Sequence, residues 1–409
     1  MRIDVFFDAF PHPAKPNLET QLQEWQRQGH TLRLYSLGRI GTATSTFPVT
    51  FIRTLRRAPL RLLCQALWRA LTHPKRTWRI FRCEPTLTQK IKLLATDAQL
   101  PTQTPDACFI HNLAAAVCFS YLKHALPAVP LAIYYHGGEL PGVPQIPPED
   151  SRAALQRADI VFSNTHTSLK EAVRRGAAPE KIACAPTAFP LERFPFARDR
   201  TYLPGGRWRF VCVGRMAPEK GFDVALRAFT VLREHTRNFD ATFIGDGPEL
   251  SCLRALAVEL QATEFVQFKG HVDSAELIPL LGEFDVFVLS SRPIPGSNWT
   301  ETQGAVMQEA MLMGTIVIAS DIGGVRESLP PALHQFIYTP GSSDGLLARL
   351  RQITQCDAET LRALSDDARR FTRHNYDIRT VNRYLLSQIA SLRTTHPNSS
   401  LRGPAPGKH

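Results

Sequence analysis

The chain has 409 residues, of which 44% are hydrophobic and 21% are charged, as expected of a folded protein of two or three domains. Collagen-like, mucin-like and wholly disordered chains are thereby excluded. Lys and Arg number 48 against 37 Asp and Glu, a net charge of +11, and no run of about 18 apolar residues predicts a transmembrane helix.

The first half of the chain alternates short apolar runs with helical patterns. Met1 to Phe7 lacks the features of a signal peptide, so we expect the protein to stay in the cytoplasm. A helix is predicted over Glu19–Gln28, ending at Gly29. The predicted strands are Ile3–Phe7, Thr31–Tyr35, Ala107–Ile110, Leu131–Tyr135 and Ile160–Ser163.

One segment of the first half carries the excess of positive charge. No acidic residue occurs between Glu24 and Glu84. The basic residues of that interval are Arg27, Arg33, Arg39, Arg53, Arg56, Arg57, Arg61, Arg69, Lys75, Arg76, Arg79 and Arg82. Leucine, alanine and tryptophan recur at near-helical spacing from Leu55 to Leu71, and Pro59 suits the first turn of a helix.

Two interpretations of this basic segment, residues 53–82, stay open. A basic helix with leucine and tryptophan on its other face is typical of binding to an anionic membrane surface. An ordinary amphipathic helix that covers a sheet, with its arginines in solvent, fits equally well. Nucleic acid is not the expected partner, because no nucleic-acid-binding motif is present.

The second half shows the same alternation more clearly. Strands are predicted at Arg209–Val213, Ala241–Ile244, Val266–Lys269, Val286–Ser290 and Ile316–Ser320. Helices are predicted at Phe222–Glu234, Leu250–Leu260, Ala275–Leu281 and Ala305–Met313. Apolar strands that alternate with helices indicate a parallel sheet covered on both faces. We therefore predict an α/β protein with two Rossmann-like domains that face a cleft.

The pattern is interrupted between Pro195 and Trp208, which places the domains at residues 1–197 and 198–375. A helix follows from residue 376 to residue 393, and residues 394–409, rich in Pro, Ser and Gly, are expected to be disordered. The eight cysteines are scattered without a C-x-x-C pair, so we expect small buried hydrophobes rather than a metal or redox site.

Ligands of open parallel sheets bind beyond the carboxyl ends of the strands. The loop after the first strand of the second domain runs from Gly214 to Gly221 and contains Arg215 and Lys220. A planar guanidinium and an ammonium close to a helix N-terminus are suited to a diphosphate. Gly270-His271-Val272, after a later strand, forms a short loop that a flat base could approach.

The strongest pattern is Glu301-Thr302-Gln303-Gly304, followed by Glu309, with seven residues between the two glutamates. If Gly304 opens a helix, the free N–H groups from Gln303 to Ala305 point at an anion. Glu309 then lies on an apolar helix and requires a buried partner, which the hydroxyls of a ribose would supply.

These features, with Gly245-Asp246-Gly247-Pro248 and Gly323-Gly324-x-x-Glu327, resemble the nucleotide-sugar half of the retaining glycosyltransferases of family 4. Phe10-Pro11, Ala158 to Val161 and Leu191 to Phe194 resemble its capsule and exopolysaccharide members, so the resemblance covers about residues 1–390. It implies the GT-B fold, with residues 1–197 on the acceptor side, residues 198–375 binding the nucleotide sugar, and the last helix crossing back to the first domain.

The resemblance also implies roles for single residues. Arg215 and Lys220 would neutralise the diphosphate, Glu309 would hold the ribose and Glu301 the donor sugar. Val272 would lie against the base, and His136 would lie beside the reacting sugar. Gly214, Thr302, Gln303 and Gly304 would complete the donor site. No metal ligand and no cofactor are expected beyond the nucleotide diphosphate sugar, most simply a UDP- or GDP-linked one.

The expected activity is that of a metal-independent hexosyltransferase acting on a glycan or lipid-linked acceptor. The basic segment would place it at the inner face of the plasma membrane. Two alternatives are a GT-B-like protein that binds a nucleotide or lipid without chemistry, and the same fold used by an epimerase or phosphorylase. Turnover of a sugar donor would distinguish a transferase from the protein without chemistry. The pair Glu301 and Glu309 favours a transferase over an epimerase or phosphorylase.

Overall fold

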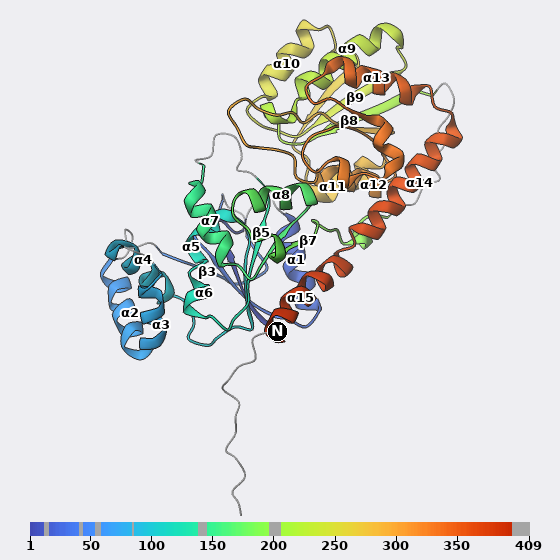
Figure 1. Ribbon diagram of the computed structural model, residues 1–409. Coiled ribbons are helices and arrows are strands. Elements are labelled where there is room, and N and C mark those ends of the chain that lie inside the picture. The colour runs from blue at the N-terminus through green and yellow to red at the C-terminus, as the bar shows by residue number, and fades with distance from the viewer. Residues whose placement is uncertain are drawn as a thin grey trace, which may run out of the picture.

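The computed structural model describes residues 1–11, 16–40, 44–53, 59–83, 86–137, 145–195 and 206–394. Within these ranges the chain forms two parallel β-sheets, each with helices on both faces (Figure 1). The predicted α/β class with two Rossmann-like domains is therefore confirmed. The tail predicted to be disordered lies, apart from residue 394, outside the described residues.

The first sheet has the strand order β3-β2-β1-β4-β5-β6-β7, and every pair of neighbours is parallel. Its strands are β1 (Arg2–Phe7), β2 (Thr31–Ser36), β3 (Val49–Phe51), β4 (Ala107–Ile110), β5 (Leu131–Tyr135), β6 (Ile160–Ser163) and β7 (Ile182–Cys184). The central strands are buried on both faces, which explains their continuous apolar runs. No strand was predicted for β3 and β7, which are edge strands of three partly or fully exposed residues each.

Helices cover the first sheet on two sides. The helices of the first domain are α1 (Pro16–Arg27), α2 (Pro59–Thr72), α3 (Pro74–Phe81), α4 (Leu87–Asp97), α5 (Leu113–Phe119), α6 (Leu122–Ala125), α7 (Pro148–Arg157) and α8 (His166–Arg174). On one face α1 buries Leu22 and Trp25 against β1 and β4. On the other, α5 and α7 pack against the sheet in a separate apolar cluster.

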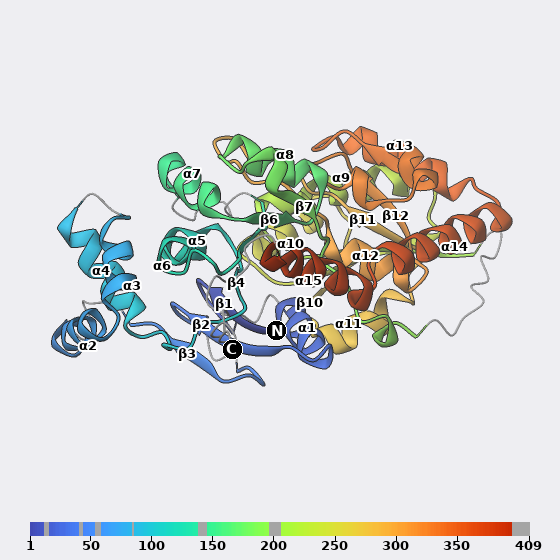
Figure 2. The same cartoon turned by 60° about the horizontal axis from the view of Figure 1, so that its bottom comes forward.

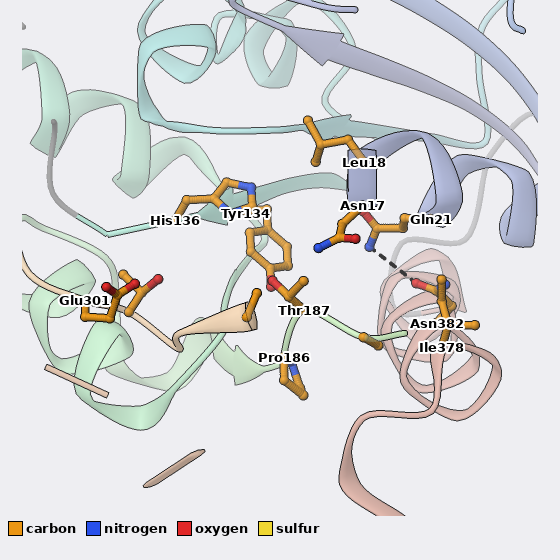
Figure 3. Close-up of a pocket in the computed structure, with 13 residues that line it drawn as sticks. Asn17, Leu18, Gln21, Tyr134, His136, Pro186, Thr187, Glu301, Ile378 and Asn382 are labelled. Carbon is orange, nitrogen blue, oxygen red and sulfur yellow. Dashed lines mark hydrogen bonds between the residues drawn. The ribbon is translucent and has the colours of Figure 1, made fainter. Parts of the chain in front are cut away.

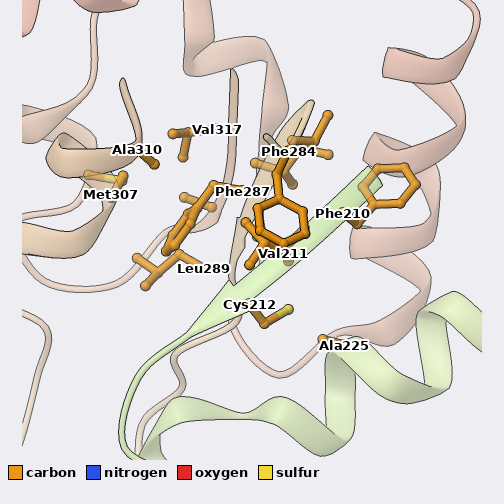
Figure 4. Packing of buried hydrophobic residues seen from close by; sticks show 14 of the residues in the cluster. Phe210, Val211, Cys212, Ala225, Phe284, Phe287, Leu289, Met307, Ala310 and Val317 are labelled. Carbon is orange, nitrogen blue, oxygen red and sulfur yellow. The ribbon is translucent and has the colours of Figure 1, made fainter. Parts of the chain in front are cut away.

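The second sheet has the order β10-β9-β8-β11-β12-β13, again with parallel neighbours. Its strands are β8 (Trp208–Val213), β9 (Phe239–Ile244), β10 (Val266–Gly270), β11 (Val286–Leu289), β12 (Ile316–Ser320) and β13 (Ile337–Tyr338). The helices before the chain returns to the first domain are α9 (Phe222–His235), α10 (Leu250–Glu259), α11 (Ser274–Leu281), α12 (Ala305–Leu312), α13 (Ser343–Thr354) and α14 (Ala358–Asn375). Figure 4 shows the core between β8, β11, β12 and α12, where aromatic and aliphatic side chains interdigitate.

The two C-terminal helices connect the domains. α14 packs on α12 of the second domain, whereas α15 (Ile378–Thr394) packs beside α1 on the first. Between them, Phe189 N donates to Tyr376 O at 2.8 Å and Ile378 N donates to Phe189 O at 3.0 Å. The helix predicted from residue 376 therefore begins at Ile378, because the two preceding residues take part in this backbone pairing.

The cysteines differ in part from the prediction. All eight are free thiols, but only Cys108 and Cys212 are buried, and Cys64 and Cys252 are exposed. Burial by apolar neighbours raises the pKa of Cys184 to about 11. None of the described helices is both long and apolar enough to cross a bilayer.

Candidate functional site

The loops that follow β8, β9 and β10 pack closely together at the carboxyl edge of the second sheet. Gly245 N donates to Gly270 O at 2.7 Å, and Met216 N donates to Asp246 O at 2.8 Å. A Cβ atom on Gly245 would lie 1.9 Å from Gly214 O, so only glycine permits this approach. The glycines of the sequence pattern thus bring these loops to one edge of the sheet.

Lys220 lies at the point where the loops after β8 and β11 meet. Gly221, with φ +60°, turns the chain into α9, and a Cβ atom there would lie 2.2 Å from Ser290 O. The Lys220 ammonium lies 2.6 Å from Glu301 Oε2, and Ser291 Oγ donates to the same oxygen at 2.9 Å. Two residues predicted separately for the donor site therefore form one ion pair.

Arg215 is held differently. Its guanidinium pairs with Glu219, a carboxylate that is buried, while the arginine side chain itself is 47% exposed. The arginine therefore keeps donor groups on the solvent side, and the buried partner restricts where they can point. It does not line the cavity described below.

Glu309 lies on α12, which begins after Gly304 as predicted. Its side chain is half-buried, and no partner for its carboxylate is found among the residues that the structure describes. Desolvation raises the pKa of Glu309 to about 7. A partly buried carboxylate without a partner is stabilised by a ligand that supplies hydroxyl donors.

His136 follows β5 at the carboxyl edge of the first sheet. Its ring stacks on that of Tyr134 with centroids 4.4 Å apart, and on that of His111 with centroids 5.6 Å apart. The Tyr134 hydroxyl donates to Ala185 O at 2.6 Å, which fixes the tyrosine ring. The position of the His136 imidazole is therefore set by packing against two other rings.

A cavity of about 390 Å³ lies between the two domains (Figure 3). It is lined by Asn17, Leu18, Gln21, Tyr134, His136, Pro186, Thr187, Ala188, Glu301, Thr302, Ala305, Ile378 and Asn382. Of the predicted site residues, His136, Glu301 and Thr302 line the cavity. Lys220 does not line it, but is paired with Glu301, which does. Gly214, Val272, Gln303, Gly304 and Glu309 do not line it either.

The cavity also contains residues that the sequence analysis did not place in the site. Asn382 of α15 is buried, and its Oδ1 accepts from Gln21 Nε2 at 3.3 Å and from Trp25 Nε1 at 3.0 Å. In the sequence, an asparagine that faces a cavity from an amphipathic helix cannot be distinguished from one that faces solvent. Only the return of α15 to the first domain makes it part of the cavity.

Two predicted donor-site residues use their side chains to join the domains. Gln303 is buried; its Oε1 accepts from Thr187 N at 2.8 Å and its Nε2 donates to Thr187 O at 2.9 Å. Asn164 Nδ2 donates to Thr302 Oγ1 at 3.4 Å. The loop before α12 therefore also holds the two domains against each other.

Glu327, at the end of the glycine motif Gly323-Gly324, makes a further contact between the domains. Its two carboxylate oxygens each accept one backbone N–H, from His166 and from Thr167, at 2.8 Å. These N–H groups form the N-terminus of α8, where a negative charge is stabilising. The carboxylate of one domain thus caps a helix of the other.

Replacing Glu327 with glutamine is expected to lower kcat/KM about tenfold, because a neutral cap weakens the contact between the two domains by about 1–2 kcal/mol. X-ray scattering should show a larger radius of gyration. Glu359→Gln, at an exposed position of α14, is the matched control. An unchanged radius of gyration in the Glu327 variant would show that this contact does not hold the domains together.

Comparison with known proteins agrees with this geometry. The family model for glycosyl transferases group 1 matches residues 194–371. A Salmonella typhimurium protein named as a colanic acid biosynthesis glycosyltransferase, WcaL, is 27% identical over 218 residues, 53% of either chain. A GDP-mannose-dependent alpha-(1-6)-phosphatidylinositol monomannoside mannosyltransferase of Mycolicibacterium smegmatis is 29% identical over 275 residues, 64% of this chain and 68% of its own.

The matched part spans about half the length of the first of these relatives. Among solved structures, Alr3699/HepE of Anabaena in complex with UDP superposes with a TM-score of 0.69 at 17% identity, over 96% of this chain and all of its own. That likeness confirms the predicted GT-B arrangement of the two domains. Residues 194–371 therefore match the model of the glycosyl transferases group 1, within a chain that has the GT-B fold.

Proposed function

We propose that this protein is a retaining hexosyltransferase that moves a sugar from a nucleotide diphosphate sugar to an acceptor hydroxyl. One observation carries the proposal. His136 and Glu301, from opposite domains, line a single cavity at the carboxyl edges of both sheets, and Lys220 is paired with Glu301 at 2.6 Å. Such an arrangement can hold a sugar between a nucleotide bound to the second domain and an acceptor bound to the first.

In the proposed reaction, the bond between the anomeric carbon and the diphosphate oxygen breaks, and a bond to the acceptor oxygen forms on the same face. The acceptor proton passes to the departing phosphate, so no protein nucleophile is required. Lys220, with Arg215, stabilises the negative charge that develops on the leaving group. These two cations can do this work without a divalent metal, which is why we propose metal-independent transfer.

The remaining donor contacts are part of the same proposal. Glu309 binds the ribose hydroxyls, which is supported by its half-buried carboxylate without a described partner. Val272 lies against the base. Backbone N–H groups from Thr302 to Gly304, before α12, face the diphosphate, since a helix N-terminus stabilises an anion.

We propose UDP or GDP as the nucleotide and a glycan or lipid-linked glycan as the acceptor. The Anabaena neighbour was solved with UDP, and the Mycolicibacterium relative is named as GDP-mannose-dependent and as acting on a phosphatidylinositol monomannoside. The WcaL relative is named for colanic acid biosynthesis, which supports a role in exopolysaccharide assembly. The place of action would be the cytoplasmic face of the plasma membrane.

Thermal stabilisation by UDP, GDP and ADP, each with and without its common sugars and without added metal, tests the donor site. A nucleotide at about 100 times its Kd is expected to add about 2.7 kcal/mol to the free energy of unfolding. Inorganic phosphate is the control, because it lacks base and ribose. Absence of a shift with every nucleotide would contradict the proposal and favour a GT-B-like protein without this donor.

A further inference from the structure

Three helices, α2, α3 and α4, form a module inserted between β3 and β4, which we call the helical module (residues 59–97). It projects from the first domain on the side away from the second domain in both views (Figures 1 and 2). None of the residues proposed for catalysis or donor binding lies in it. The module therefore has no evident part in the chemistry of the cavity.

α2 is apolar on two opposite faces. Its inner face buries Leu62 and Ala66, and Ala66 lies in the same cluster as Ile80 of α3 and Leu94 of α4. Its outer face carries an apolar stripe at helical spacing, made up of Leu60, Leu63, Cys64, Leu67 and Leu71. A helix that only covered a sheet would need the inner face alone, so the outer stripe calls for a partner.

The outer surface of the module concentrates the exposed apolar side chains of the molecule. In the part of the chain that the structure describes, thirteen large hydrophobic side chains are exposed, and eight of them lie between residues 60 and 87. In α2, Leu60 is 79% exposed, Leu67 66% and Leu71 82%. Trp78 and Phe81 of α3 add two aromatic rings. Such a concentration marks an interaction surface.

The charge of the module is positive wherever it is exposed in the described residues. Arg61, Lys75 and Arg79 are exposed, and the Arg82 guanidinium lies 4.7 Å from the centroid of the Trp78 ring. The sequence has no acidic residue between residues 24 and 84, and Asp97 of α4 is buried. The exposed basic residues fit both initial interpretations, and the exposed apolar stripe of α2 favours the first.

The module is attached firmly to the domain. Inside the module the Arg76 guanidinium lies 2.6 Å from the buried Asp97 carboxylate, and the hydroxyl of Tyr121, just before α6, donates to the same carboxylate at 3.5 Å. Arg69, also buried, donates from Nη2 to the carbonyl oxygens of Ala98 and Leu100. A surface held in this way is presented in a fixed orientation relative to the rest of the first domain.

We propose that the helical module docks on an anionic lipid bilayer, with the stripe of α2 among the acyl chains and the basic residues at the headgroups. Charge decides the occupant, because a second copy on this face would bring two positive surfaces together, whereas anionic headgroups attract each Lys or Arg. The absence of a spanning helix in the described residues makes this docking peripheral. The inference rests on the proposed function only in assuming an acceptor carried by a membrane.

Sedimentation with vesicles tests the docking. We expect the protein to bind phosphatidylcholine vesicles that contain phosphatidylglycerol at low salt, and not vesicles of phosphatidylcholine alone. Leu67→Glu combined with Leu71→Glu should lower the binding constant at least about a hundredfold, because two leucines leave the acyl region and two negative charges are added. Val258→Glu is the matched control, since Val258 on α10 is also 66% exposed.

Lys75→Ala combined with Arg79→Ala should weaken binding and reduce its dependence on salt. Wild-type protein that ignores anionic vesicles, or a stripe variant that binds like wild type, would overturn the inference. So would a dimer in light scattering that the stripe variant abolishes, since a second copy would then occupy the stripe. Stabilisation by UDP or GDP, measured on the same variants, should be unchanged, so a failure of docking and a failure of the donor site are told apart.

Discussion

Lys220→Ala is expected to slow turnover about a hundredfold or more, the largest effect of any single change that we predict. The ammonium lies 2.6 Å from Oε2 of Glu301, a residue that lines the cavity. Its removal takes away the charge that balances the departing diphosphate, a contribution that is usually large in catalysis. It also leaves Glu301 with only the Ser291 hydroxyl among the partners described above.

The measurement is the release of nucleotide from the donor that the thermal shifts identify, followed as kcat and KM separately. Lys170→Ala is the matched control, because Lys170 is exposed on α8. Lys220→Arg should recover part of the rate, since it restores the charge with a different shape. Near-normal turnover of the Lys220→Ala variant, with an unchanged Tm, would reject the role assigned to this lysine.

Glu309→Ala is expected to weaken nucleotide binding about tenfold to a hundredfold. A hydrogen bond to a charged group contributes about 1.5–3 kcal/mol, and the proposed ribose contact is of this kind. Isothermal titration with the preferred nucleotide measures the loss. Glu259→Ala, at an exposed position of α10, is the control. Unchanged affinity in the Glu309 variant would remove this residue from the ribose site.

The raised pKa of Glu309 also predicts a dependence on pH. In the free protein this carboxyl, with a pKa of about 7, binds a proton that the unfolded chain releases at lower pH. The free energy of unfolding should therefore fall as the pH rises from about 4.5 to about 7. The fall should be on the order of 2 kcal/mol, after allowance for the partial exposure of Glu309. Glu309→Gln should remove that decline.

Nucleotide binding should show the opposite trend. Ribose hydroxyls donate to the ionised carboxylate and stabilise it, so affinity should rise with pH through the region near 7. Titrations with UDP or GDP on either side of pH 7, with wild type and Glu309→Gln, measure this. A pH dependence that is the same in both proteins would assign the titration to another group.

The sequence was a good guide to the elements of the two sheets. Strands such as β5 and β12 are buried at every position, so their apolar runs mark them without knowledge of their neighbours. The edge strands β3 and β13 gave no such signal, because they are three and two residues long and pair with one neighbour each. The spacing of Glu301 and Glu309 around the start of α12 could also be read directly, since it depends on one loop and one helix.

Contacts between residues far apart in the sequence could not be predicted from these local patterns. Gln303 was predicted to offer backbone donors to a phosphate, yet its side chain pairs with Thr187 of the other domain. Arg215 and Lys220 were predicted to have similar roles. In the structure Arg215 is paired with the buried Glu219, whereas Lys220 is paired with Glu301. Periodicity describes which face of an element is apolar, and says nothing about which distant side chain meets it.

What the sequence by itself determined is therefore the buried strands of both sheets, some of their helices, the likeness of the second domain to glycosyl transferases group 1, and the excess of positive charge before residue 84. Only the tertiary structure decided that Asn382 reaches the cavity, that Glu327 caps a helix of the other domain, and that α2 keeps an apolar face in solvent. The reason is physical. Local patterns follow from the geometry of single elements, whereas these contacts depend on how two sheets and a returning helix pack in space.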